Sequence, residues 1–260
     1  MPTVRDHFWL WGHEAGSHDK GYGISGTSRM TPAEGAFYLG TPNLIIVRYN
    51  DLPAPPYDQY ALALSPLRRV VWSIVGAGGR TDSEEVGRAR ALAARFPNIT
   101  GVMMDDFFKH DPTHVAVHTP ESLQAIRDQL TVSGRTLDLW VVLYQQQLDL
   151  PVSAHLQLCD VVTFWTWWAE RLEQLEQNFA QFERLAPTSR KVLGCYMWDY
   201  GNRKPMPVAL MEHQCQLGLR WLREGRIEGM IFLASCICDM GLETVEWTRE
   251  WVRAVGDEPC

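Results

Sequence analysis

Short apolar segments alternate with amphipathic segments along the whole chain. The apolar segments are mostly continuous, which is typical of parallel strands that are covered on both faces. The segments expected as strands are His7–Trp11, Asn43–Tyr49, Arg69–Val75, Thr100–Asp105, Asp138–Tyr144, Val161–Trp165, Lys191–Trp198 and Gly229–Ala234.

Helical patterns lie between these strands. Thr31 precedes Pro32 and Glu34, which together form a capped helix start with proline at the first helical position. Other helices are expected to open at Thr81 and Thr119, after Ala169, and at Pro207 and Glu243, with weaker patterns over Tyr57–Leu64 and Pro151–Leu158.

This repeated alternation predicts one α/β domain over residues 1–260, folded as a single (β/α)8 barrel. A doubly wound open sheet is the alternative. That fold would be expected to show a glycine-rich first turn, and residues 12–26 lack the required glycine spacing. No linker and no internal repeat divides the chain.

Composition narrows the possible partners. The chain is 46% hydrophobic and 21% charged, with a net charge of -7 and no basic run, which argues against nucleic acid as a partner. No apolar segment approaches the roughly 20 residues that cross a bilayer, and no signal peptide is visible. The six cysteines lack paired spacing, so we expect mostly free thiols and a cytoplasmic protein. We expect no cofactor, and the oligomeric state stays open.

The most informative segment is Ile99–Phe108, an apolar strand that stops at two adjacent carboxylates, Asp105 and Asp106. Aspartate is a poor strand residue, and neighbouring carboxylates raise each other's pKa. The pair could simply cap the strand and anchor the next loop. In a barrel, however, residues that follow the strands meet at one mouth, where catalysis takes place, so we expect these carboxylates in a pocket there.

Other strand ends supply aromatic, amide and acidic side chains. Flat aromatic faces stack on sugar rings, amides and carboxylates bind hydroxyl groups, and two carboxylates can cleave a glycosidic bond. The expected catalytic groups are Asp105 or Asp106 paired with Asp199, with Glu170 as the substitute for either. The expected substrate-binding residues are Trp11, His13, Glu14, Arg48, Asn50, Tyr144, Gln145, Trp165, Trp167, Tyr196, Trp198 and Asp239.

The segment GVMMDDFF resembles the fourth-strand motif of chitinase-type barrel hydrolases, a glycine followed by spaced acidic residues. Aligned on Gly101, Met103 replaces one expected aspartate, Asp105 matches the next, and Phe107 stands where the catalytic glutamate would be. The chain also resembles the broader set of barrel sugar hydrolases, whose carboxylates end strand four and strand six or seven. That resemblance implies a pairing of Asp105 or Asp106 with Asp199 or Glu170.

We therefore expect a glycoside hydrolase that acts on an oligosaccharide or glycoside. A metal-dependent sugar isomerase, epimerase or lyase is one alternative, because acidic and histidine side chains at the strand ends could bind a divalent cation. The candidate ligands are His13, Glu14, His18, Asp51, Asp105, Asp106 and Asp239. A non-catalytic carbohydrate-binding barrel is the other alternative.

Overall fold

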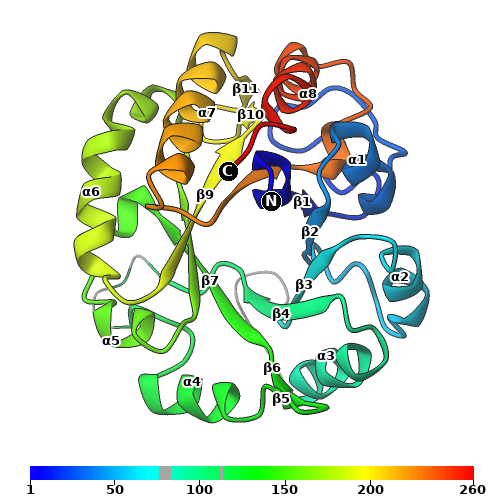
Figure 1. Cartoon of the computed structure of the whole chain (residues 1–260), viewed down its shortest axis with the longest axis vertical. Helices are drawn as coiled ribbons and strands as arrows, with labels where there is room; N and C mark the ends of the chain where they lie inside the picture. Colours follow the sequence, from blue (N-terminus) through cyan, green and yellow to red (C-terminus); the bar gives the residue numbers. More distant parts are fainter. Residues whose placement is uncertain (76–82, 110, 112–113) are drawn as a thin grey trace.

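The computed structural model describes residues 1–75, 83–109, 111 and 114–260, and it confirms the (β/α)8 barrel. Eight parallel strands close into one barrel in the order β1-β12-β9-β8-β7-β4-β3-β2. Figure 1 shows the helices arranged around this ring of strands. The barrel strands are β1 (Phe8–Gly12), β2 (Asn43–Ile46), β3 (Arg69–Ser73), β4 (Ile99–Met104), β7 (Asp138–Tyr144), β8 (Val161–Trp165), β9 (Arg190–Tyr196) and β12 (Gly229–Leu233).

The predicted helical segments form helices, and their starts follow the predicted capping. Thr31 accepts a hydrogen bond from the Glu34 backbone N–H, and Thr119 accepts one from Ser122. The expected start at Thr81 lies outside the described residues. The helices are α1 (Pro32–Leu39), α2 (Asp58–Ala63), α3 (Ser83–Arg95), α4 (Pro120–Arg127), α5 (Ser153–Leu156), α6 (Leu175–Leu185), α7 (Val208–Arg223) and α8 (Glu243–Val255).

Several short elements were not predicted. The hairpin β5 (Thr131–Val132) and β6 (Arg135–Thr136) precedes β7. The predicted strand Lys191–Trp198 ends early, because Trp198 leaves the barrel and pairs in the hairpin β10 (Trp198–Asp199) and β11 (Lys204–Pro205). The 3-10 turns are η1 (Val4–His7), η3 (Gln145–Gln147), η4 (Ala169–Gln174) and η5 (Ser235–Ile237).

Large indole rings fill the barrel interior where a neighbouring strand carries glycine. Trp165 of β8 lies against Gly194 of β9, so closely that a Cβ atom on Gly194 would be 2.0 Å from the ring. Trp140 of β7 lies against Gly101 of β4 in the same way, with 2.8 Å from such a Cβ to its ring nitrogen. The two glycines therefore provide the space that the indoles occupy, since protein interiors are close-packed.

Ion pairs close the amino-terminal ends of the strands. Arg190 and Asp138, at the starts of β9 and β7, form a salt bridge of 2.5 Å. Asp160, just before β8, pairs with Arg127 at 2.5 Å and accepts a hydrogen bond from the Leu139 backbone N–H at 2.9 Å. These carboxylates have cationic partners, so this mouth of the barrel is a stabilising end.

The two ends of the chain meet at the same mouth (Figure 1). Thr3 pairs with Pro259 in an antiparallel bridge, and the Val4 N–H donates to the Glu258 carbonyl at 3.0 Å. All six cysteines are free, as the sequence predicts. Within the described ranges, no helix combines the length and apolar character needed to cross a bilayer.

Candidate functional site

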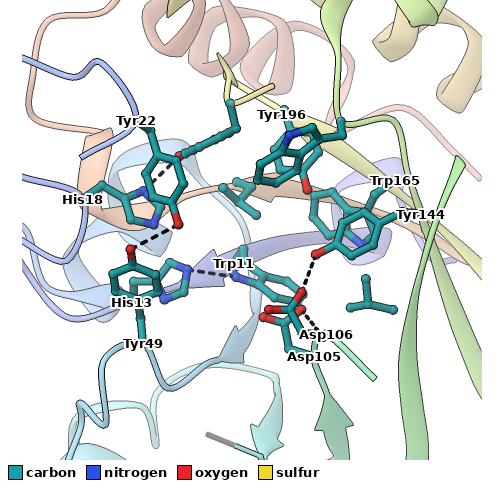
Figure 2. Close-up of a pocket in the computed structure, with 14 residues that line it drawn as sticks. Trp11, His13, His18, Tyr22, Tyr49, Asp105, Asp106, Tyr144, Trp165 and Tyr196 are labelled. Carbon is teal, nitrogen blue, oxygen red and sulfur yellow. Dashed lines mark hydrogen bonds between the residues drawn. The ribbon is translucent and has the colours of Figure 1, made fainter. Parts of the chain in front are cut away.

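A pocket opens at the carboxyl-terminal mouth of the barrel, the face that the sequence indicates. It holds about 530 Å³ of empty space, counted to its open rim. Asp105 and Asp106 lie on one side of this pocket, and a group of histidine and tyrosine rings lies on the other (Figure 2).

The two carboxylates reach the pocket because of the local backbone. Gly101, Met103 and Asp105 alternate along β4 and its end, which directs Asp105 toward the barrel interior. Asp106 has a φ of 51°, and this left-handed turn brings the next side chain to the same pocket. The Asp106 backbone N–H donates to the Asp105 carboxylate at 2.9 Å.

The surroundings of Asp105 favour its protonated form. Burial raises its pKa well above the ordinary value of 3.8, and the neighbouring Asp106 carboxylate raises it further. The Asp106 N–H and the Lys109 ammonium act in the opposite direction with smaller effect. Asp105 can therefore remain a neutral acid at a pH where an ordinary aspartate is ionised.

Tyrosine hydroxyl groups surround the carboxylates. The Tyr144 hydroxyl donates to Asp106 Oδ1 at 3.1 Å. Burial raises the pKa of Tyr144 and of Tyr196, and the charges of Asp105 and Asp106 raise both further. The two phenols therefore stay protonated and can donate hydrogen bonds beside the carboxylates.

The opposite wall is a cluster of neutral rings. The Trp11 indole N–H donates to His13 Nε2 at 3.1 Å, so the ring proton of neutral His13 belongs on Nδ1. His18 Nδ1 lies 3.0 Å from the Tyr200 hydroxyl, and Tyr22 and Tyr49 share a hydrogen bond at 3.1 Å.

Both histidines are held in the uncharged form. Burial lowers the pKa of His18 to about 4. Burial also lowers the pKa of His13 well below 6.5, and the nearby His18 lowers it further. The histidines therefore act as neutral polar surfaces in this pocket.

Eight of the predicted site residues line this pocket. They include the two expected carboxylates and six expected binding residues. Trp165 contacts Trp11 edge-on with ring centroids 5.2 Å apart and lies 4.9 Å from Tyr196. The six binding residues are Trp11, His13, Tyr144, Trp165, Trp167 and Tyr196.

Asp199 and Glu170, the expected partners of the carboxylate pair, do not line the pocket. Asp199 is fully buried, and its oxygens accept hydrogen bonds from the Ala169 N–H and from the backbone and side-chain N–H groups of Asn202. Glu170 is exposed and accepts from the Asn202 amide at 2.6 Å. These carboxylates hold together the loops after β8 and β9.

The remaining predicted residues also lie outside this pocket. Three of them have structural partners instead: Arg48 pairs with Glu85 at 2.9 Å, the hydroxyl of Tyr60 donates to Glu14, and Asp239 accepts from two backbone N–H groups at residues 29 and 30. Trp198 donates from its indole to the Tyr22 carbonyl at 2.9 Å and so supports the loop that carries this pocket residue. Asn50 is exposed and Gln145 half-buried, both outside the pocket lining.

Six pocket residues were absent from the expected catalytic and substrate-binding residues: His18, Tyr22, Tyr49, Val142, Tyr200 and Leu233. Of these, His18 was expected only as a candidate metal ligand. Val142 and Leu233 belong to predicted strands, where alternation directs every second side chain inward. His18 and Tyr22 belong to the loop after β1, which has no periodic pattern. Only its position after the first strand pointed to the mouth.

The metal-dependent alternative can be compared with the geometry. Among the residues that the structure describes, no three histidine, cysteine, aspartate or glutamate side chains gather closely enough to hold a metal ion. His13 and His18 lie together with ring centroids 4.9 Å apart, but aromatic rings surround them.

No protein-family model matches the chain, and no curated protein sequence matches it. Solved structures do share its fold. A Bacteroides thetaiotaomicron protein assigned as an α-L-fucosidase superposes with a TM-score of 0.62 at 11% identity, covering 98% of this chain and 95% of that one. The spore cortex-lytic enzyme SleL of Bacillus megaterium gives 0.61 at 12% identity, covering 98% and 74%.

A third similar structure is a xylanase-α-amylase inhibitor protein, XAIP-I, in complex with trehalose. It gives a TM-score of 0.60 at 13% identity and covers 96% of this chain and 98% of that one. At identities this low, these superpositions show a shared barrel fold and nothing more. Function has to be argued from the pocket itself.

Proposed function

We propose that the protein is a glycoside hydrolase in which Asp105 is the general acid. The observation that carries this proposal is a partly buried carboxyl group with a raised pKa, beside a second carboxylate, in a pocket walled by aromatic rings. Glycosidic oxygen is a poor leaving group until it is protonated, so an acid whose pKa is raised well above the ordinary value meets the main chemical requirement. The aromatic rings offer flat faces for a sugar.

Asp106 has the complementary role. Its carboxylate is exposed to the pocket and oriented by the Tyr144 hydroxyl, so it can stabilise the positive charge that develops on the sugar ring. Asp105 gives its proton to the bridging oxygen as the bond from C1 to that oxygen breaks. Water then adds to C1, and the proton that it loses restores the acid form of the pair.

A non-catalytic sugar-binding barrel is the second candidate. One observation favours it: among the described residues that line the pocket, both acidic side chains come from the end of β4, and none comes from the opposite wall. A hydrolase with two opposed carboxylates would differ in this respect. The raised pKa of Asp105 is the feature that a binding protein would not require.

The test is hydrolysis of a panel of oligosaccharides and aryl glycosides by wild type, Asp105→Asn and Asp106→Asn, with and without a chelator. We expect Asp105→Asn to lose about 10²–10⁴-fold in kcat/KM on oligosaccharides. The loss should be much smaller on dinitrophenyl glycosides, because their leaving group departs without a proton. Asp128→Asn, an exposed change on the outer surface, is the matched control.

Each alternative has its own result. Equal losses on both substrate types would remove the acid role from Asp105. Sugar binding without cleavage of any substrate would identify a binding protein. Turnover that disappears with chelator would identify a metal-dependent enzyme.

A further inference from the structure

A second pocket adjoins the first at the carboxyl-terminal mouth. It holds about 820 Å³ of empty space, counted to its open rim. Asp106, Tyr144 and Trp167 line both pockets, so these three side chains form the boundary between them. Asp105 lines only the first pocket.

The boundary is an ordered structure. The Tyr144 hydroxyl donates to Asp106, and the Tyr144 ring meets the Trp167 ring edge-on, with centroids 6.1 Å apart and planes at 84°. A molecule bound at the two carboxylates in the first pocket therefore lies directly beside the second pocket.

The second pocket has its own polar and aromatic surfaces. Trp168 lies in its wall, beside Gly201, where a Cβ atom would be 2.4 Å from the indole. Gln146 also lines it, and the buried side-chain oxygen of Gln146 has no hydrogen-bond partner among the described residues. An unpaired buried acceptor is costly, and a hydroxyl group of a ligand would satisfy it.

We infer that the substrate spans both pockets, with the ring that is cleaved in the first and a second sugar, the leaving group, in the second. This inference rests on the proposed function. The bond to be broken then lies over Asp106, and Asp105 reaches the bridging oxygen from the first pocket. Trp168 supplies a stacking face for the second sugar, and Gln146 accepts a hydrogen bond from one of its hydroxyl groups.

The experiment measures sugar binding to the Asp105→Asn variant by calorimetry. This variant lacks the proposed general acid, so the sugars stay uncleaved during the measurement. The probes are the methyl glycosides of glucose, N-acetylglucosamine and fucose, each paired with the corresponding methyl disaccharide. We expect one disaccharide to bind about 10-fold more tightly than its monosaccharide, as one added stacking or hydrogen-bonding contact would give. Adding Gln146→Ala or Trp168→Ala to the Asp105→Asn variant should remove the difference between disaccharide and monosaccharide affinity. The affinity for the monosaccharide should stay unchanged.

Gln129→Ala, on an exposed side chain beyond the end of α4, is the matched control and should keep the difference. Thermal unfolding identifies a variant that fails to fold, and Gln146→Ala tests the inference if Trp168→Ala is such a variant. Equal affinity for monosaccharide and disaccharide would overturn the inference, as would a difference that persists in both pocket variants. So would a failure of every sugar to bind. The expected binding pattern without hydrolysis in wild type would refute the proposed function alone.

Discussion

The two mouths of the barrel shift the pKa of an aspartate in opposite directions. At the amino-terminal mouth, Asp6 lies beside the Thr3 backbone N–H and the Arg68 guanidinium, and both lower its pKa. At the carboxyl-terminal mouth, burial and the neighbouring Asp106 raise the pKa of Asp105. The same residue type is therefore stabilised as an anion at one end and held ready to carry a proton at the other. The first end contributes to stability, and the second holds a carboxyl group in an environment that disfavours its charge.

The largest expected effect comes from the packing beneath the pocket. Gly194→Ala would place a methyl group into the Trp165 ring and force the indole out of its site. We expect a loss of about 3 kcal/mol in the free energy of unfolding, because overpacking a filled core is costly. Urea unfolding measures it. Gly87→Ala, at an open helix position, is the control and should be neutral or stabilising. A fully stable Gly194→Ala would contradict the packing described.

The second prediction concerns how the free energy of unfolding changes with pH, to which His18 at the carboxyl-terminal mouth contributes. Burial lowers the pKa of His18 from 6.5 to about 4, so the unfolded chain takes up a proton before the folded chain does. The stability associated with neutral His18 is complete above pH 6.5 and is lost as the pH falls toward about 4, on the order of 3 kcal/mol.

Urea unfolding of wild type and His18→Gln at several pH values between 7 and 4 checks this prediction. The variant should lose less stability across that range than wild type. Asp105 changes stability with the opposite sign over part of this range, and comparing the two proteins cancels its contribution. Parallel curves would show that His18 does not carry the effect.

Matching substitutions at the two mouths should then differ in sign. Asp160→Asn removes the charge that pairs with Arg127, and we expect it to cost about 1–2 kcal/mol. Differential scanning calorimetry at neutral pH should show a lower Tm. An unchanged Tm would mean that solvent screens this partly exposed pair.

Asp105→Asn should act in the other direction and give the smallest effect, a gain of about 1 kcal/mol at neutral pH. The pKa of Asp105 in the folded protein lies above its ordinary value of 3.8, so wild type loses stability as the pH rises from there through the raised value. The amide cannot ionise, so the Tm of the variant should exceed that of wild type at pH 7 and approach it in acid. A lower Tm at pH 7 would show that this carboxyl group stabilises the fold.

The sequence was sufficient for the barrel because strands covered on both faces leave long apolar runs, as in β7 and β12. It was also sufficient for the carboxylate pair, since Asp105 follows directly on the inward alternation of β4. The choice of the mouth that carries the pocket needed only the rule that residues after the strands converge there.

Side-chain direction after a strand end could not be predicted. Asp105 directly follows β4, but Asp199 lies three residues beyond the end of β9, where the chain turns into a hairpin and directs Asp199 toward backbone N–H groups. Tyr22 reaches the pocket from a loop whose shape depends on tertiary contacts, such as the one with Trp198. Such contacts join residues far apart in the chain and leave no local pattern.

The pairing of Thr3 with Pro259 is useful for circular permutation and for oriented immobilisation of the protein. Because both ends of the chain meet at the mouth opposite the pocket, a short linker between them could support circularly permuted versions, with new ends opened in an outer loop. Attachment to a solid support near either residue would orient every molecule with its pocket toward the solution.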